Sequence, residues 1–157
     1  MKKLVFLITT LLVVALVGAG CHRDDPTPTP TPDTYAVVYK IGNSVDDVTM
    51  SPCFKMNVTY TDANGQQVTE NNVTLPWTKT VEIKLPFHAK LTGQLTYNEE
   101  ELPDHLVYVL NYGMGLYVNG VGSPDMTEKY SSVTKENFLI VASEHPEWLQ
   151  FTQEKDF

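Results

Sequence analysis

Apolar and polar residues alternate with a period of two over much of the chain after Tyr35. From Ala89 to Tyr97 every second residue falls on one face, which carries Ala89, Leu91, Gly93, Leu95 and Tyr97. Residues 55–61 repeat the pattern with Met56, Val58 and Tyr60. Because successive side chains of a strand point to opposite faces, this alternation predicts strands that are buried on one face.

About eight strands are expected, in the segments 35–41, 55–61, 66–70, 80–85, 89–97, 106–110, 115–118 and 138–143, with 73–75 as a further short strand piece. Asp62-Ala-Asn-Gly65 predicts a turn, because Asn and Gly tolerate positive φ, and it joins two of these segments in a hairpin. The helical signal is confined to a turn or two near 147–153. We therefore expect an all-β domain over 35–157, an immunoglobulin-like antiparallel sandwich of about seven to eight strands. A small lipocalin-like barrel is the alternative.

The N-terminus has the pattern of an export signal. Lys2 and Lys3 precede an apolar run over 4–17, and small residues fill 18–20 before Cys21. This arrangement resembles the signal of bacterial lipoproteins, in which the cysteine carries the lipid and begins the mature protein. It implies a signal peptide over 1–20 and a lipidated Cys21, with an uncleaved N-terminal anchor and an ordinary thiol as the alternative.

The residues after Cys21 predict where the anchored protein lies. Asp24 and Asp25 resemble the surface-export signal of Bacteroidetes lipoproteins, which implies a lipid-anchored protein on the outer membrane, facing outward. A plain acidic tail on the periplasmic face is the alternative. Residues 26–32 alternate Pro and Thr, a composition that favours a stiff polyproline II stalk of roughly 20 Å. Residues 21–34 are therefore expected to form a linker.

Charge and cysteine content exclude several functions. Removal of residues 1–20 takes away Lys2 and Lys3 and leaves nine basic against 19 acidic residues, a net charge of −10. That balance argues against binding to nucleic acid or to anionic lipid, both of which need clustered Lys and Arg. Cys53 is the one cysteine besides Cys21, and we expect it to be a small buried apolar residue without a disulfide.

Part of the domain resembles a known family. The pieces, in order, are Thr59-Tyr-Thr-Asp62 with Asn64-Gly65, then Leu75-Pro-Trp77, Thr80-Val81 and Val118-Asn-Gly120. Together they look like the outer domain of the mycobacterial small membrane proteins called MmpS. The resemblance spans about 55–122 and implies a small β-sandwich that works beside a transporter. The family's membrane helix and paired cysteines have no counterpart here. The resemblance therefore serves mainly as an argument for the fold.

Aromatic residues form the candidate ligand surface. Trp77 follows a proline near a predicted strand edge, and Tyr108, Tyr112 and Tyr117 surround Gly113-Met-Gly115. The two glycines predict a bulge or the close approach of another backbone. The aromatic rings could stack on a sugar or another flat ligand, or they could fill the core.

Carboxylates supply the candidate chemistry of an enzyme. Residues 99–101 are three glutamates, and Asp104 and His105 follow closely. Paired carboxylates can divide acid and base roles in glycoside hydrolysis, and carboxylates with histidine can hold a metal. A solvated acidic loop is the other interpretation. The sequence has neither a Gly-x-Ser-x-Gly elbow nor a phosphate-binding glycine loop.

These observations favour a non-enzymatic binding or accessory module in a surface or transport assembly. We expect it to need no cofactor and to act through an envelope protein partner or an extracellular ligand. A glycan-acting enzyme using the carboxylates of 99–104 is one alternative, and a structural subunit of a surface polymer is another.

Overall fold

The computed structural model describes residues 32–42, 44–45, 48–49 and 51–157, without the side chains of 44–45, 48–49, 108–109 and 130–131. Cys21, Asp24, Asp25 and most of the Pro-Thr run lie outside the described residues. Asp33–Phe157 form one compact unit. Within the described residues, no helix is both long and apolar enough to cross a membrane.

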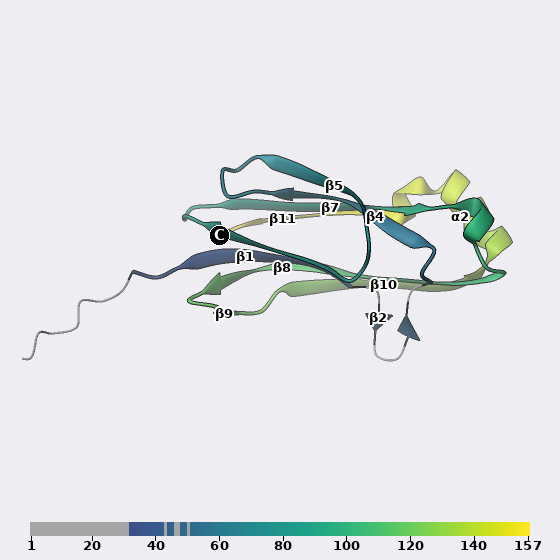
Figure 1. Cartoon of the computed structure of the whole chain (residues 1–157), viewed down its shortest axis with the longest axis horizontal. Coiled ribbons are helices and arrows are strands. Elements are labelled where there is room, and N and C mark those ends of the chain that lie inside the picture. The colour runs from purple at the N-terminus through teal and green to yellow at the C-terminus, as the bar shows by residue number, and fades with distance from the viewer. Residues whose placement is uncertain (1–31, 43, 46–47, 50) are drawn as a thin grey trace, which may run out of the picture. The chain divides into compact units, whose positions relative to one another are not determined.

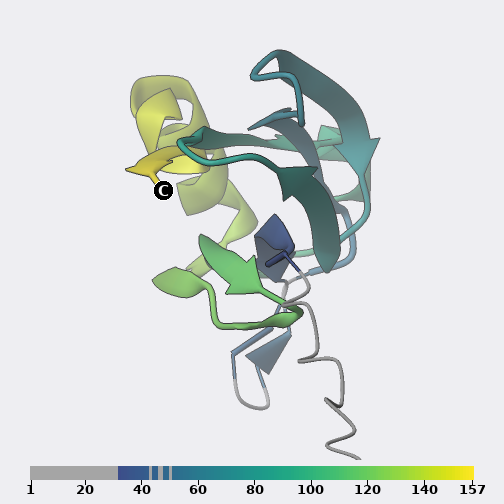
Figure 2. The same ribbon diagram turned by 90° about the vertical axis from the view of Figure 1, so that its left-hand side faces the viewer.

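Two antiparallel sheets stack face to face, as Figures 1 and 2 show. The first has the order β10-β8-β1-β6, with β9 also paired to β8. Its strands are β1 Tyr35–Gly42, β6 Trp77–Ile83, β8 His105–Val118, β9 Val121–Gly122 and β10 Asp125–Thr134. The expected all-β sandwich is confirmed, and because both sheets are open at their edges the domain is not a closed barrel.

The second sheet has the order β11-β7-β4-β5. Its strands are β4 Phe54–Thr61, β5 Gln67–Val73, β7 His88–Tyr97 and β11 Gln150–Asp156. A separate two-stranded hairpin consists of β2 Ser44–Val45 and β3 Val48–Thr49. Immunoglobulin constant domains divide their strands as ABED and CFG. Here β1 instead pairs with β6 and β8, so the likeness lies in the architecture and not in the strand order.

The inward faces of both sheets meet in one apolar core. Its largest fully buried side chains include Tyr39, Ile41, Met56, Leu91, Leu106, Leu110 and Met114. Burial of each such side chain contributes roughly 1.5–3 kcal/mol to folding. The expected alternation in β4 and β7 is confirmed, because Met56, Val58, Ala89 and Leu91 are all fully buried.

Segments 106–110 and 115–118, expected as separate strands, form the single 14-residue strand β8. The Gly-Met-Gly between them makes room for a neighbouring backbone, as expected. A Cβ at Gly113 would collide with the Asp125 carbonyl, and one at Gly115 would collide with the Ser123 carbonyl. The glycines therefore let β10 and its lead-in approach β8 while the β8–β10 register stays regular.

The prediction of a strand over 138–143 is wrong, because these residues belong to helix α2, Lys135–Glu144. A short apolar run such as Phe-Leu-Ile-Val-Ala cannot by itself distinguish a strand from a buried helix. The residue immediately before the helix supplies a helix start signal. Thr134 caps the helix, since its hydroxyl accepts a hydrogen bond from the Asn137 backbone N–H at 3.3 Å.

Packing then holds α2 against the end of the sandwich. Phe138 is 3% exposed, and its ring lies 5.3 Å from that of Phe54 and 4.9 Å from that of Tyr97. After α2 comes the short 3-10 helix η2, Pro146–Leu149, which overlaps the start of the weak helical signal at 147–153. The rest of that region continues as β11 rather than as a helix.

The entry of the chain into the domain is fixed by one turn residue. Asn119, with a φ of 51°, and Gly120, with a φ of 79°, form the tight turn between β8 and β9. The Asn119 amide oxygen accepts from the Thr34 backbone N–H at 2.9 Å, and its Nδ2 donates to Asp33 at 2.7 Å. Its own backbone N–H donates to the Thr34 carbonyl at 2.9 Å. We call this set of contacts the Asn119 clamp.

Candidate functional site

Trp77 fills the core instead of presenting its ring to a ligand. It is 9% exposed, and its ring lies 5.7 Å from Tyr60, which in turn lies 5.7 Å from Tyr39. Its indole N–H donates to Glu70 at 2.9 Å, which satisfies the polar edge of the ring. Burial raises the pKa of Tyr39 to about 12, and its hydroxyl donates to the Thr61 carbonyl at 3.0 Å.

The three tyrosines of the candidate surface are not brought together as a set. Tyr112 is 7% exposed and stacks inside the core on Phe151, with ring centroids 3.7 Å apart. Tyr117 lies on the strand that pairs with β9 and is half-buried beside Gly122. The side chain of Tyr108 lies outside the description. Trp77 and Tyr112 therefore fill the core, which was the alternative to a ligand-stacking role.

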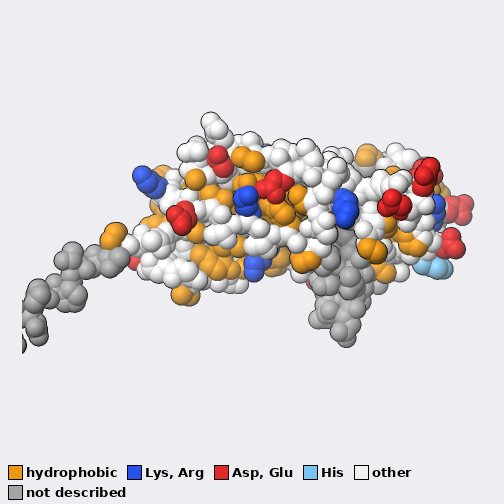
Figure 3. Space-filling view, viewed as in Figure 1, with side chains coloured by type: hydrophobic (Ala, Val, Ile, Leu, Met, Phe, Trp, Pro, Cys, Tyr) orange, Lys and Arg blue, Asp and Glu red, His pale blue; other side chains and the backbone are white. Residues whose placement is uncertain are grey.

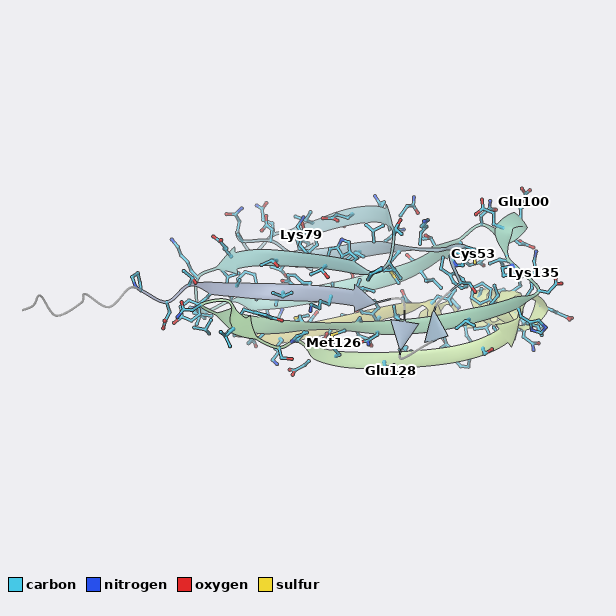
Figure 4. The ribbon with its side chains drawn as sticks, turned by 60° about the horizontal axis from the view of Figure 1, so that its bottom comes forward. Cys53, Lys79, Glu100, Met126, Glu128 and Lys135 are labelled. Carbon is cyan, nitrogen blue, oxygen red and sulfur yellow. The ribbon has the colours of Figure 1, made fainter. Side chains whose placement is uncertain are left out.

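The three glutamates of the candidate enzyme loop form a short 3-10 helix, η1 Glu99–Glu101, with all three side chains exposed. Asn98 caps it, accepting from the Glu100 N–H at 3.2 Å. Lys135 donates from Nζ to the Glu99 carbonyl at 2.9 Å and from its backbone N–H to the Asp104 carbonyl at the same distance. Figure 4 shows Glu100 and Lys135 at one end of the sandwich. The loop is held through its backbone, and its carboxylates face solvent.

Within the described residues, no group of three or more His, Cys, Asp or Glu side chains is arranged to hold a metal ion. His105 and Asp104 are both exposed.

Cys53 is a half-buried free thiol that packs against the core. Burial raises the pKa of Cys53, and the nearby charge of Glu101 acts in the same direction, so the neutral thiol is favoured.

A surface that the sequence did not indicate lies on α2 and η2. Trp148 is 54% exposed and Ile140 is 47% exposed. The Trp148 ring stacks on His145 with centroids 4.8 Å apart, and His145 lies 3.2 Å from Glu147. The backbone N–H of Glu147 and the His145 side chain hold the pKa of that carboxyl below its usual range. We call Ile140, His145, Glu147 and Trp148 the tip.

Acidic side chains gather at the end of the molecule that carries α2, the right-hand end in Figure 3. The exposed carboxylates of η1, α2, η2 and the residue before β8 are Glu99, Glu100, Glu101, Asp104, Glu136, Glu144 and Glu147. The chain has two tryptophans, and composition alone cannot tell which is buried and which is exposed. An exposed Trp among carboxylates has the chemistry to contact a surface that combines apolar and basic groups.

The tip lies at the far end of the domain from the Asn119 clamp. Strand β8 begins beside Asp104, whose carbonyl bonds the first residue of α2, and it ends at the turn that holds Thr34. Fourteen residues of strand separate these points, a length of about 45 Å. The domain therefore presents Trp148 away from the residues through which the chain enters it (Figure 1).

At the clamp end, a hollow of about 710 Å³ opens between the β4–β5 turn and the β6–β7 connection. Its lining includes Asn64, Gln67, Glu82, Lys84 and His88. His88 is exposed and pairs with Asp156 at 2.6 Å. Glu82 of β6 and Lys84, the residue after β6, carry opposite charges. The hollow therefore has no net charge that would select a charged ligand.

Comparison with known proteins adds no assignment, because no protein-family model matches the chain and no curated protein matches it either.

Proposed function

We propose that this protein is a lipid-anchored module of a bacterial cell envelope that binds a partner through the tip and has no catalytic role. The observation that carries the proposal is the exposure of Trp148 and Ile140 at the end of the domain farthest from the Asn119 clamp. Trp is one of the residue types enriched among the side chains that dominate binding energies. The surrounding carboxylates favour a partner whose contact surface combines apolar and basic groups.

A lipid anchor and a signal for export to the cell surface complete the proposal. Cys21 would carry the lipid, the Asp24-Asp25 pair would direct export to the cell surface, and the Pro-Thr run would hold the domain away from the membrane. Labelling with a fatty-acid probe tests the first step: we expect the label on the natural chain and none on Cys21→Ala. Label that persists on the variant would remove the anchor from the proposal. Protease treatment of intact cells tests the surface position, since a periplasmic protein would survive it.

Site-specific crosslinking in intact cells tests the tip. A photoreactive residue placed at 140 or 148 of the full chain is expected to give a defined crosslinked species. The same residue at Thr80, which is exposed on the outer face of β6, serves as the matched control and is expected to give none. Monomer alone from both tip positions would refute the proposal.

The partial MmpS resemblance supports one form of this proposal, in which the partner is an envelope transporter. Affinity capture from native membranes distinguishes that form from a surface assembly of another kind. High-molecular-weight ladders on unboiled gels would instead favour the polymer subunit. Turnover of a glycan that disappears when Glu99, Glu100, Glu101 and Asp104 are replaced by amides would favour the enzyme.

A further inference from the structure

We propose that the outer face of the β11-β7-β4-β5 sheet is a binding groove for a neutral saccharide chain. The groove uses none of the tip residues and does not depend on the partner proposed above, although Gln150 at its β11 end directly follows η2. It carries a shallow hollow of about 460 Å³ that reaches across all four strands. The proposal rests on the regular arrangement of hydrogen-bonding groups in this hollow, on its lack of charge, and on the side chains there that bond to no other protein group.

A row of four threonines crosses the sheet at right angles to the strands. The strand register places Thr69 opposite Thr59, Thr59 opposite Thr92, and Thr92 opposite Thr152. Neighbouring strands lie about 4.8 Å apart, so the row extends over about 14 Å. It therefore offers a line of hydroxyl groups as long as a short oligosaccharide.

A parallel row of amides lies two residues along the strands. Asn57 is opposite Gln94, and Gln94 is opposite Gln150. Hydroxyl and carboxamide groups each both donate and accept hydrogen bonds, which is the property that recognises sugar hydroxyls in either orientation. The two rows together form a two-dimensional array of such groups within one hollow.

The groove is neutral in a strongly acidic chain. None of the residues that line it is ionisable, although the chain carries 11 basic and 19 acidic residues. At its margin, Lys90 is paired with Glu154 at 2.6 Å, and Lys55 donates to Thr74 at 3.2 Å. A charged ligand would lose hydration here without meeting an opposite charge, which is unfavourable. The charge pattern therefore selects an uncharged polar ligand.

The β7 and β11 side of the groove keeps its hydrogen-bonding capacity free. Thr59 and Thr69 bond each other at 2.8 Å, and Asn57 accepts from the Asn72 N–H at 2.9 Å. In contrast, within the described part of the chain, the side chains of Thr92, Gln94 and Thr152 bond to no other protein group. One half of the array is thus held in place by the protein, and the other half is available to a ligand. Peptides, by comparison, bind sheets along strand edges through their backbones, which this face does not offer.

Native gel electrophoresis of the full-length protein in detergent, through gels that contain a polysaccharide, tests the proposal. The probes are neutral α-glucan, β-glucan, xylan and mannan, with polygalacturonate and chondroitin sulfate as acidic comparisons. We expect at least one neutral polymer to retard the protein and the acidic polymers not to do so. Titration with the corresponding neutral oligosaccharide then gives the affinity.

The double variant Thr92→Ala/Gln94→Ala is expected to weaken this binding at least about tenfold, because it removes groups that each form one or two hydrogen bonds. Thr78→Ala/Thr80→Ala, on the outer face of the opposite sheet, is the matched control and should bind as the natural chain does. Absence of retardation by every neutral polymer, preference for an acidic one, or equal binding by the groove variant would each overturn the proposal. A partner crosslinked at the tip together with no glycan binding would overturn this inference and leave the proposed function standing.

Discussion

The two seams where the sheets meet edge to edge are held in different ways. At the first, Glu70 of β5 accepts from Trp77 and Lys79 of β6, each at 2.9 Å, and from the Tyr60 hydroxyl at 3.3 Å. Lys79 also lies over the Tyr60 ring, 5.2 Å from its centroid. At this seam the half-buried Glu70 carboxylate accepts three hydrogen bonds and lies beside the aromatic rings of Tyr60 and Trp77.

The second seam joins β10 to β11 through exposed groups. Lys155 pairs with Asp125, whose side chain is 70% exposed, and Lys129 donates to the Gln150 carbonyl at 3.2 Å. Exposed pairs of this kind contribute little, because water screens them and long side chains lose freedom. Beneath them, however, Phe151 stacks on Tyr112. The comparison teaches that the first seam depends on a polar network and the second on the core below it.

The largest expected effect tests the second half of that comparison. Phe151→Ala removes the ring that fills the space above Gly93 and against Tyr112, and we expect it to lower the free energy of unfolding by about 3–5 kcal/mol. Urea unfolding followed by tryptophan fluorescence measures this. The adjacent exposed change Thr152→Ala should stay within about 0.5 kcal/mol. Equal losses for both would mean that β11 is not held by its core contact.

Removal of the first seam's acceptor should have the next largest effect. Glu70→Ala leaves the mostly buried Trp77 N–H without its acceptor, and we expect a loss of about 1–3 kcal/mol in the same assay. Glu82→Ala, an exposed carboxylate of β6, is the matched control and is expected to have almost no effect. A Glu70 variant as stable as the Glu82 variant would show that the network adds nothing to the aromatic packing.

The same carboxyl predicts a dependence on pH. Hydrogen bonds from Trp77, and then from Lys79, hold the pKa of Glu70 below its usual range. A group whose pKa is lower in the folded state stabilises the fold above its unfolded value of about 4.3, and that stability is lost as the pH falls further. The stability difference between the natural chain and Glu70→Gln should therefore be constant near neutrality and shrink below about pH 4.3. A difference that does not change down to pH 2.5, on the order of two units lower, would contradict the network.

The smallest effect is expected at the exposed pair of the second seam. Lys155→Ala should change the free energy of unfolding by less than about 0.5 kcal/mol, and added salt should not alter the difference much. Thermal unfolding at low and high ionic strength measures both. A loss as large as that of Glu70→Ala would erase the distinction between the two seams.

The sequence predicts a strand best where one face of the strand is exposed to solvent and the other is buried. The hairpin of β4 and β5 follows from alternation and from Asp62-Ala-Asn-Gly65, where Gly65 has the expected positive φ of 77°. Strands β10 and β11 are not predicted, because each is an edge strand and few of their described side chains are buried. Leu85, the last residue of the segment 80–85 expected as a strand, lies beyond the end of β6 and is 43% exposed.

The candidate site could not be predicted in the same way. Trp77 and Trp148 are the same residue type, yet one is 9% exposed and the other 54%. The difference comes from long-range placement: Trp77 faces Tyr60 across the sandwich, whereas Trp148 lies on a connection outside it. The groove on the outer sheet depends on the register of four strands, β4, β5, β7 and β11, which no local pattern specifies.

The Asn119 clamp has a mechanical consequence. The clamp fixes Asp33 and Thr34 at the start of β1, and β1 is paired along its length to β6 on one side and β8 on the other. A tension applied between these residues and the far end of the domain would act lengthwise on β1. All its ladder hydrogen bonds would then be loaded together in shear, instead of opening one after another like a zipper. The strand at which the chain enters the domain is thus held on both sides against a pull.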